Sequence, residues 1–221
     1  MKITEAKIHE IDRKWVGIEN RKTIKKIGKK FKYKGFISPL FGYIYVDKEY
    51  GLSLRIVGNI ERDGKNKLYI NEDFLNDELD MSYELMTKLD LDVTILSDDI
   101  VSHIEGSKIV ENKLEDNYKN INNFLSTREL EYLDPFRDKK YPDDIEIIYT
   151  DKETEETENL WVTIEGIHDR YPELLICKLS DNSNLRPDLV EGDYVAVKYD
   201  EETDTCIFVS ELKRREKEHE E

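Results

Sequence analysis

The sequence predicts an α+β protein with two lobes. Alternating apolar and polar residues occur in two separate stretches, helical apolar spacing occurs between them, and Pro135 and Pro142 mark a border. At 221 residues the chain is long enough for two small domains, and its thirteen Tyr and seven Phe are untypical of a disordered chain. We expect an α+β lobe over residues 1–133, a small β-rich domain over 134–210 and a charged tail over 211–221.

The N-terminal lobe begins with a segment, Ile3–Ile11, that we expect to form a strand. A short helix over Asn20–Phe31 follows, because Ile24, Ile27 and Phe31 recur at the spacing of one buried stripe. The lobe is therefore expected to begin with a strand and then a helix.

An antiparallel meander is the clearest local prediction. Phe41–Val46 is apolar on both faces, and the stretch Leu52–Ile60 alternates between apolar and polar residues as a half-buried strand does. Asp63-Gly64 is typical of a tight hairpin turn, after which Leu68–Ile70 returns as the third strand.

Helices are expected in the middle of the chain. Phe74–Leu89 and Leu114–Leu125 both carry apolar residues at helical spacing. Ser126 and Glu129 have the spacing of a capping box, which predicts a further turn of helix. Between the two helices, Val93–Leu96 is expected to form a strand.

The C-terminal third predicts a small antiparallel sheet or barrel, because five short apolar stretches are separated by turns. A tight turn at Gly192-Asp193 leads into the fourth of them. The five expected strands are Ile145–Tyr149, Leu160–Ile164, Leu174–Leu179, Tyr194–Tyr199 and Cys206–Val209.

The charge of the chain is large and unevenly distributed. The net charge of −16 predicts solubility and an attraction to basic partners. Between Arg13 and Lys34, however, ten basic residues stand against one acid, Glu19, so this stretch carries +9 and the other 199 residues carry −25.

The acidic excess favours a non-enzymatic protein that binds and neutralises a basic partner protein, as inhibitors of the immunity type or proteins of phage–host conflict do. No apolar run reaches membrane-spanning length, and the first residues lack the apolar core of a signal peptide, so we expect a cytoplasmic protein without a membrane partner. The candidate partner-binding acids are Asp73, Asp77, Glu78, Asp80, Asp98 and Asp99.

Nucleic-acid binding through the basic stretch 13–34 is the alternative hypothesis. On a helix, its lysines would stand on the side opposite Ile24 and Ile27, where they could follow a phosphate backbone. The competing interpretation is a solvated basic face that pairs with the acids of the same protein. The lysines concerned are Lys22, Lys25, Lys26, Lys29 and Lys30.

The sequence contains no complete catalytic or metal site. Asp90-Leu91-Asp92-Val93-Thr94 fits the Asp-x-Asp-x-Thr pattern of haloacid-dehalogenase-like phosphatases, but it follows a helix-like segment where that family has a strand. Cys177 and Cys206 are typical of buried thiols, and the four histidines are dispersed, so we expect neither metal nor cofactor. An enzyme whose site is assembled from distant segments stays a third hypothesis, and the sequence does not specify the oligomeric state.

The C-terminal third contains an ordered series of short motifs, namely Phe136-Arg137, Tyr141-Pro142-Asp143-Asp144-Ile145, Leu160-Trp161-Val162 and Gly192-Asp193-Tyr194-Val195. This series resembles the uncharacterised bacterial domain of unknown function 2314 and its relatives. The resemblance covers residues 134–200 and implies a small β-rich binding domain without an established enzymatic activity. Phe136, Tyr141 and Trp161 could form an apolar contact patch on it, or Trp161 could be a core residue of an alternating strand.

Overall fold

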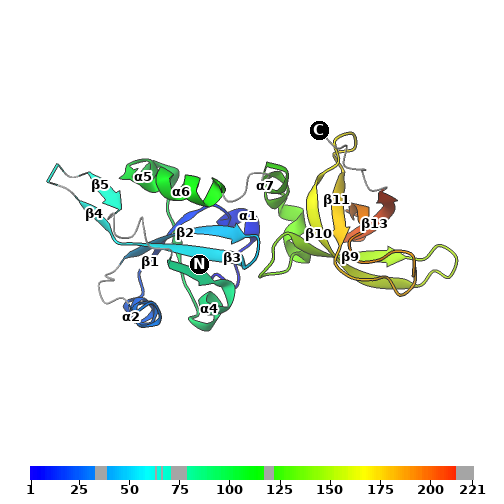
Figure 1. Cartoon of the computed structure of the whole chain (residues 1–221), viewed down its shortest axis with the longest axis horizontal. Coiled ribbons are helices and arrows are strands. Elements are labelled where there is room, and N and C mark those ends of the chain that lie inside the picture. Colours follow the sequence, from blue (N-terminus) through cyan, green and yellow to red (C-terminus); the bar gives the residue numbers. More distant parts are fainter. Residues whose placement is uncertain (33–38, 63, 66, 71–78, 117–121, 213–221) are drawn as a thin grey trace, which may run out of the picture. The chain divides into compact units, whose positions relative to one another are not determined.

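The computed structural model describes residues 1–32, 39–62, 64–65, 67–70, 79–116 and 122–212. The fold is α+β, as the sequence predicts, and the chain divides into two compact units (Figure 1). Unit 1 comprises Met1–Asn120 with Lys139–Tyr141, and unit 2 comprises Ile121–Asp138 with Pro142–Glu221.

Unit 1 is built on a five-stranded antiparallel sheet with the strand order β6-β3-β2-β1-β7. A smaller three-stranded sheet has the order β4-β5-β8, in which β5 and β8 run parallel. The strands are β1 Trp15–Ile18, β2 Leu40–Asp47, β3 Gly51–Gly58, β4 Ile60–Arg62, β5 Leu68–Ile70, β6 Leu79–Ser82, β7 Thr94–Ile95 and β8 Ile104–Glu105.

Helices cover both faces of the large sheet, as Figure 1 shows. On β2, Ile44 faces a core that includes Ile24 and Ile27, whereas Tyr43 faces a second core that includes Leu114. This is the alternation that a strand buried on both faces requires. The helices on the first face are α1 Ile8–Ile11, α2 Arg21–Lys30 and α4 Tyr83–Lys88, and those on the second are α5 Asp98–Ser102 and α6 Ser107–Asp116.

The predicted meander is present, but it is divided between the two sheets. Strands β2 and β3 pair in the large sheet, and β4 and β5 continue the antiparallel course in the small one. The division falls at Gly58, whose φ of +80° turns the chain. The side-chain amide of the next residue, Asn59, donates to the Pro39 carbonyl at 2.8 Å. Asp63 of the predicted turn lies outside the described residues.

The predicted first strand, Ile3–Ile11, is wrong. Its second half is the helix α1, in which Ile8 and Ile11 are three positions apart and both face the core. The carboxylate of Glu10 accepts a hydrogen bond from the Lys7 amide at 3.2 Å, which caps this short helix. Local hydrogen bonding and a helical repeat of two isoleucines therefore prevail over the extended conformation.

The predicted helix Phe74–Leu89 is wrong over residues 79–82. These residues form β6, which adds to the edge of β3 so that Met81 lies opposite Leu54. A helix starts only after Ser82, whose hydroxyl accepts from the Leu85 amide at 3.4 Å. Residues 74–78 lie outside the described part of the chain.

The expected capping box at Ser126 is also wrong. Ser126 lies inside α7, Asn122–Arg128, rather than at the beginning of a helix. The predicted helix Leu114–Leu125 corresponds to the end of α6 and the beginning of α7, and residues 117–121 between them are not described. The short strand predicted at Val93–Leu96 is confirmed by β7.

Unit 2 is a closed five-stranded barrel, and all five predicted strands are confirmed. Each strand pairs antiparallel with the next, and β13 closes the barrel by pairing parallel with β9. A 3-10 helix, Glu131–Phe136, adds Leu133 to the barrel core, where Cys177 and Cys206 are buried as free thiols. The strands are β9 Asp144–Thr150, β10 Thr157–Ile167, β11 Leu174–Leu179, β12 Tyr194–Asp200 and β13 Thr205–Leu212.

None of the helices in the described ranges has both the length and the apolarity needed to cross a bilayer.

Candidate nucleic-acid interface

The two units differ sharply in charge. Unit 1 contains 23 Lys or Arg and 22 Asp or Glu, which gives a net charge of +1. Unit 2 contains 11 Lys or Arg and 28 Asp or Glu, which gives −17. The acidity of the chain is therefore a property of the barrel unit, whereas in unit 1 the charge of +9 on the basic stretch is offset by about −8 over the other residues.

Helix α2 carries the densest positive charge of unit 1. The helix begins after Asn20, whose side-chain oxygen accepts from the amides of Lys22 at 3.0 Å and Thr23 at 3.3 Å. Ile24 and Ile27 are buried in the core below the sheet and hold the helix in place. The apolar positions thus fix which side of α2 faces solvent.

We call the solvent side of α2 the cationic face. All six of its side chains are exposed, and none forms an ion pair or side-chain hydrogen bond with a residue that the structure describes. The lysines predicted as a nucleic-acid-binding set therefore lie together, as that hypothesis requires. The cationic face consists of Arg21, Lys22, Lys25, Lys26, Lys29 and Lys30.

Repulsion on the cationic face is not relieved within the helix, which contains no acidic residue. Four like-charged pairs are four positions apart, and two more are three positions apart. At about 0.2–0.5 kcal/mol for each pair, this arrangement destabilises α2 by roughly 1–3 kcal/mol. An anion bound to this face would remove that cost.

The other basic residues of the stretch 13–34 do not extend the cationic face as a block. Arg13 pairs with the buried carboxylate of Asp12 at 3.4 Å, and Lys14 is half-buried. Lys32 is exposed just beyond the helix, where its φ of +56° ends the helical conformation. Lys34 lies outside the described residues.

The six predicted partner-binding acids are not shown as one face. Asp73, Asp77 and Glu78 lie outside the described residues. Asp80 on β6 accepts two hydrogen bonds from the guanidinium of Arg55 on β3, so its charge is compensated inside unit 1. Asp98 and Asp99, in the first turn of the five-residue helix α5, are exposed acids at some distance in the sequence from the other four.

The three residues of the expected apolar patch belong to different units. Tyr141 is part of unit 1, where the Lys140 ammonium lies 4.8 Å from its ring centre. Phe136 is half-buried against the barrel and contacts Tyr199, with 6.1 Å between the ring centres. Trp161 is 36% exposed on the outer surface of β10, so the alternative that it is a core residue is wrong.

The aspartates of the phosphatase-like motif have structural partners. The carboxylate of Asp92 pairs with the N-terminal ammonium at 2.6 Å, and Asp90 pairs with Lys2. The pairing of Asp92 with the ammonium lowers the pKa of its carboxyl. These contacts tie the N-terminus to the segment before β7, and they give both aspartates of the motif a cationic partner.

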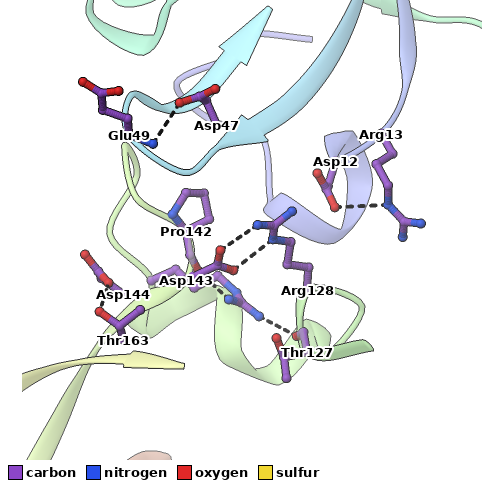
Figure 2. Close-up of polar contacts among 11 residues, drawn as sticks. Asp12, Arg13, Asp47, Glu49, Thr127, Arg128, Pro142, Asp143, Asp144 and Thr163 are labelled. Atoms are coloured by element: carbon purple, nitrogen blue, oxygen red, sulfur yellow. Dashed lines mark hydrogen bonds and ion pairs between the residues drawn. The ribbon is translucent and has the colours of Figure 1, made fainter. Parts of the chain in front are cut away.

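Figure 2 shows Asp143 and Asp144, at the beginning of the first barrel strand, β9. Arg128 donates to both oxygens of Asp143 at 2.9 and 2.6 Å, and Thr163 donates to Asp144 at 2.6 Å. Burial raises the pKa of Asp144, although the bond from Thr163 opposes this. No group of three or more His, Cys, Asp or Glu in the described ranges could hold a metal ion.

No family model, no curated protein and no solved structure matches this chain.

Sequence reasoning found the cationic face but missed where the negative charge is concentrated. The visible cluster of acids between Asp73 and Asp99 directs the prediction to that part of the sequence. The larger excess belongs to the barrel unit, for example to the turn 151–156 and to Asp200-Glu201-Glu202. Counting charges separately on each side of the predicted border would have revealed it.

Proposed function

We propose that the protein binds nucleic acid through the cationic face of α2, by contacts to phosphates rather than to bases. The observation that carries this proposal is the set of six exposed cations on one helix, none of which is paired with an acid in the described part of the chain. Five of them are lysines, which act as point charges towards phosphate and read base edges less well than arginine does. We therefore expect sequence-independent binding.

The spacing of the lysines suits a repeating anion. Lys22, Lys26 and Lys30 succeed one another every four residues, which is about 6 Å along a helix axis. The whole helix is about 15 Å long, so that it can reach several phosphates of one backbone at once. The strongly acidic unit 2 opposes the approach of nucleic acid, which weakens binding. The lysine–phosphate contacts make the binding sensitive to salt.

A salt titration tests the proposal. The affinity of the full chain for a fluorescent duplex of arbitrary sequence is measured by anisotropy at increasing salt concentration. If four to six phosphates are contacted, the logarithm of the affinity falls with the logarithm of salt with a slope of about −4 to −5. Lys25→Gln with Lys29→Gln reduces the magnitude of this slope by about 2.

The matched control alters the same number of charges elsewhere. Lys88 in α4 of unit 1 and Lys198 in β12 of unit 2 are exposed lysines that do not belong to α2, and their replacement by Gln changes the net charge equally. Equal losses of affinity in the two double variants would show that only net charge matters, which would contradict an interface on α2.

A second proposal is favoured by the charge of unit 2. We propose that the barrel binds a basic protein, because its net charge of −17 would attract and steer such a partner. This moves the partner-binding surface of the original hypothesis from the acids around Asp98 to the barrel. A partner that is itself a nucleic-acid-binding protein has the required charge.

A further inference from the structure

One edge of the barrel is only partly closed. Strand β13 pairs with β12 from Thr205 to Leu212, but its ladder with β9 on the other side consists of a single pair, Ile207 with Ile148. Beyond that pair, residues 209–212 have no strand neighbour on this side in the described part of the chain. Val209, Ser210 and Glu211 are all exposed.

Such an edge is competent for strand addition. Backbone groups on an open edge can pair with an extended peptide, and closed barrels normally remove edges of this kind. Proteins usually block exposed edges with lysine, proline or a covering segment. Residues 209–212, Val-Ser-Glu-Leu, contain neither lysine nor proline, and Val209 offers an apolar side chain that is 41% exposed.

The charged residues near this edge indicate which kind of peptide could pair with it. Because β9 and β13 run parallel, the turn that follows β9, residues 151–156, lies at the same end of the barrel as the open part of β13. This turn contains four acids and one lysine, and Glu153, Glu155 and Glu156 are exposed. On the edge itself, the carboxylate of Glu211 is paired with the Arg186 guanidinium at 2.9 Å, so the negative charge beside the edge comes from the turn.

Asp151 of this turn stays ionised near neutral pH. The amides of Glu153 and Thr154 donate to its carboxylate at 3.0 and 2.8 Å, and the Thr154 hydroxyl donates as well. The bonds from Thr154 lower the pKa of Asp151 most. The end of the barrel beside the open edge therefore repels acidic strands, including a second copy of this chain with its charge of −16.

We propose that the open edge of β13, residues 209–212, is the docking site for an extended segment rich in lysine and arginine from a partner protein. The segment would add as a further strand beside β13, and its cations would face the acidic turn 151–156. This inference rests on the second proposed function, the binding of a basic protein by unit 2, and specifies the surface and the conformation of the partner.

The test uses the full chain and two synthetic peptides of equal charge. The first peptide alternates lysine and valine over about eight residues, a length that is typical of strands, and the second has proline in place of alternate valines, which removes the amides needed for pairing. We expect the first peptide to bind about tenfold more tightly, because one or two backbone hydrogen bonds of about 1 kcal/mol are at stake. Hydrogen exchange should slow at the amides of residues 209–212 only with the first peptide.

A variant with Glu153→Gln, Glu155→Gln and Glu156→Gln tests the choice of a basic segment. These exposed turn residues can change without loss of the barrel core, and their replacement should weaken binding of the first peptide. Equal binding of both peptides without slower exchange at β13 would overturn strand addition while supporting the second proposed function. Failure of both peptides to bind would overturn the two together.

Discussion

Units 1 and 2 differ in how their charged residues are distributed. Unit 1 is nearly neutral, with 23 basic and 22 acidic residues, and concentrates six cations on one helix. Unit 2 spreads its excess of 28 acids over 11 bases around a closed barrel. The net charge of −16 describes neither unit. A partner inferred from that sum alone would fit the acidic unit 2 and would overlook the cationic helix of unit 1.

One arginine from each unit illustrates a difference in burial. In unit 2, Arg137 is 3% exposed, donates to the carbonyls of Thr127 and Pro142, and lies 3.3 Å from the carboxylate of Asp134. In unit 1, Arg55 is 12% exposed and its partner Asp80 is 35% exposed. Removal of a deeply buried cation leaves its partners uncompensated in a region that water hardly reaches.

The largest expected effect follows from this difference. Arg137→Met should destabilise unit 2 by about 3–5 kcal/mol, whereas Arg55→Met should cost unit 1 about 1–2 kcal/mol. Hydrogen exchange of strand amides, followed separately in β9–β13 and in β1–β3, measures each loss. Equal losses in the two variants would show that burial does not set the cost.

Two glycines provide the next comparison. Both have positive φ, +73° at Gly51 in unit 1 and +92° at Gly192 in unit 2. A Cβ at Gly51 would lie 2.1 Å from the carbonyl oxygen of Lys140, which also accepts from the Leu52 amide at 2.7 Å. At Gly192 the nearest atom is the flexible Lys178 Cε, at 3.8 Å.

Gly51→Ala should therefore cost about 3 kcal/mol, and Gly192→Ala about 1 kcal/mol, because only the first adds a backbone clash to the unfavourable φ. Urea unfolding of the two variants measures the difference. A loss at Gly192 as large as that at Gly51 would mean that φ alone determines the penalty.

A smaller, pH-dependent effect is expected at Glu158 of the barrel. Its carboxylate accepts from the Ser183 hydroxyl and from the amides of Asn184 at 3.0 Å and Leu185 at 3.4 Å. Partial burial raises the pKa of Glu158, but these hydrogen bonds outweigh it and the net shift is downward. The stabilisation is therefore present above the unfolded pKa of about 4.3 and is lost as pH falls through the lower folded value.

Glu158→Gln should lower the unfolding free energy by about 1 kcal/mol at neutral pH, and the difference from the unaltered protein should shrink below about pH 4. Urea unfolding at several pH values measures both. The exposed neighbour Glu156→Gln serves as the control and should show little effect. A difference that stays constant into the acid range would contradict the role assigned to the ionised carboxylate.

The smallest expected effect has the opposite sign. Lys25 has like-charged neighbours at Arg21, Lys22 and Lys29, so Lys25→Gln should stabilise unit 1 at low salt by a few tenths of a kcal/mol for each pair removed. The gain should disappear at high salt, where these charges are screened. Thermal unfolding at low and high salt measures it, with Lys88→Gln as control. A loss of stability would contradict unrelieved repulsion on α2.

The sequence predicted the barrel more completely than the sheet of unit 1, for a physical reason. Barrel strands bury one face, so their side chains alternate, as in β10, where Leu160 and Val162 face inward and Trp161 outward. In unit 1, β6 is decided by long-range pairing with β3, which no local pattern reveals. Helix α2 was predictable because Asn20 caps it and its buried stripe is regular.

The candidate site was partly predictable in the same way. Exposure of the lysines follows from the helical repeat opposite Ile24 and Ile27. The pairing of Asp80 with Arg55 and the open edge of β13 depend on which strands become neighbours. Those contacts join residues that are far apart in the sequence, so they cannot be predicted from composition or from a local pattern.

The most direct test of the account is a map of backbone amide chemical shifts during titration of the full chain with a short duplex. The account predicts that the changes concentrate on residues 21–30, that they saturate, and that added salt reverses them. Changes concentrated on the barrel, or none at concentrations where anisotropy reports binding, would contradict the assignment of nucleic-acid binding to α2.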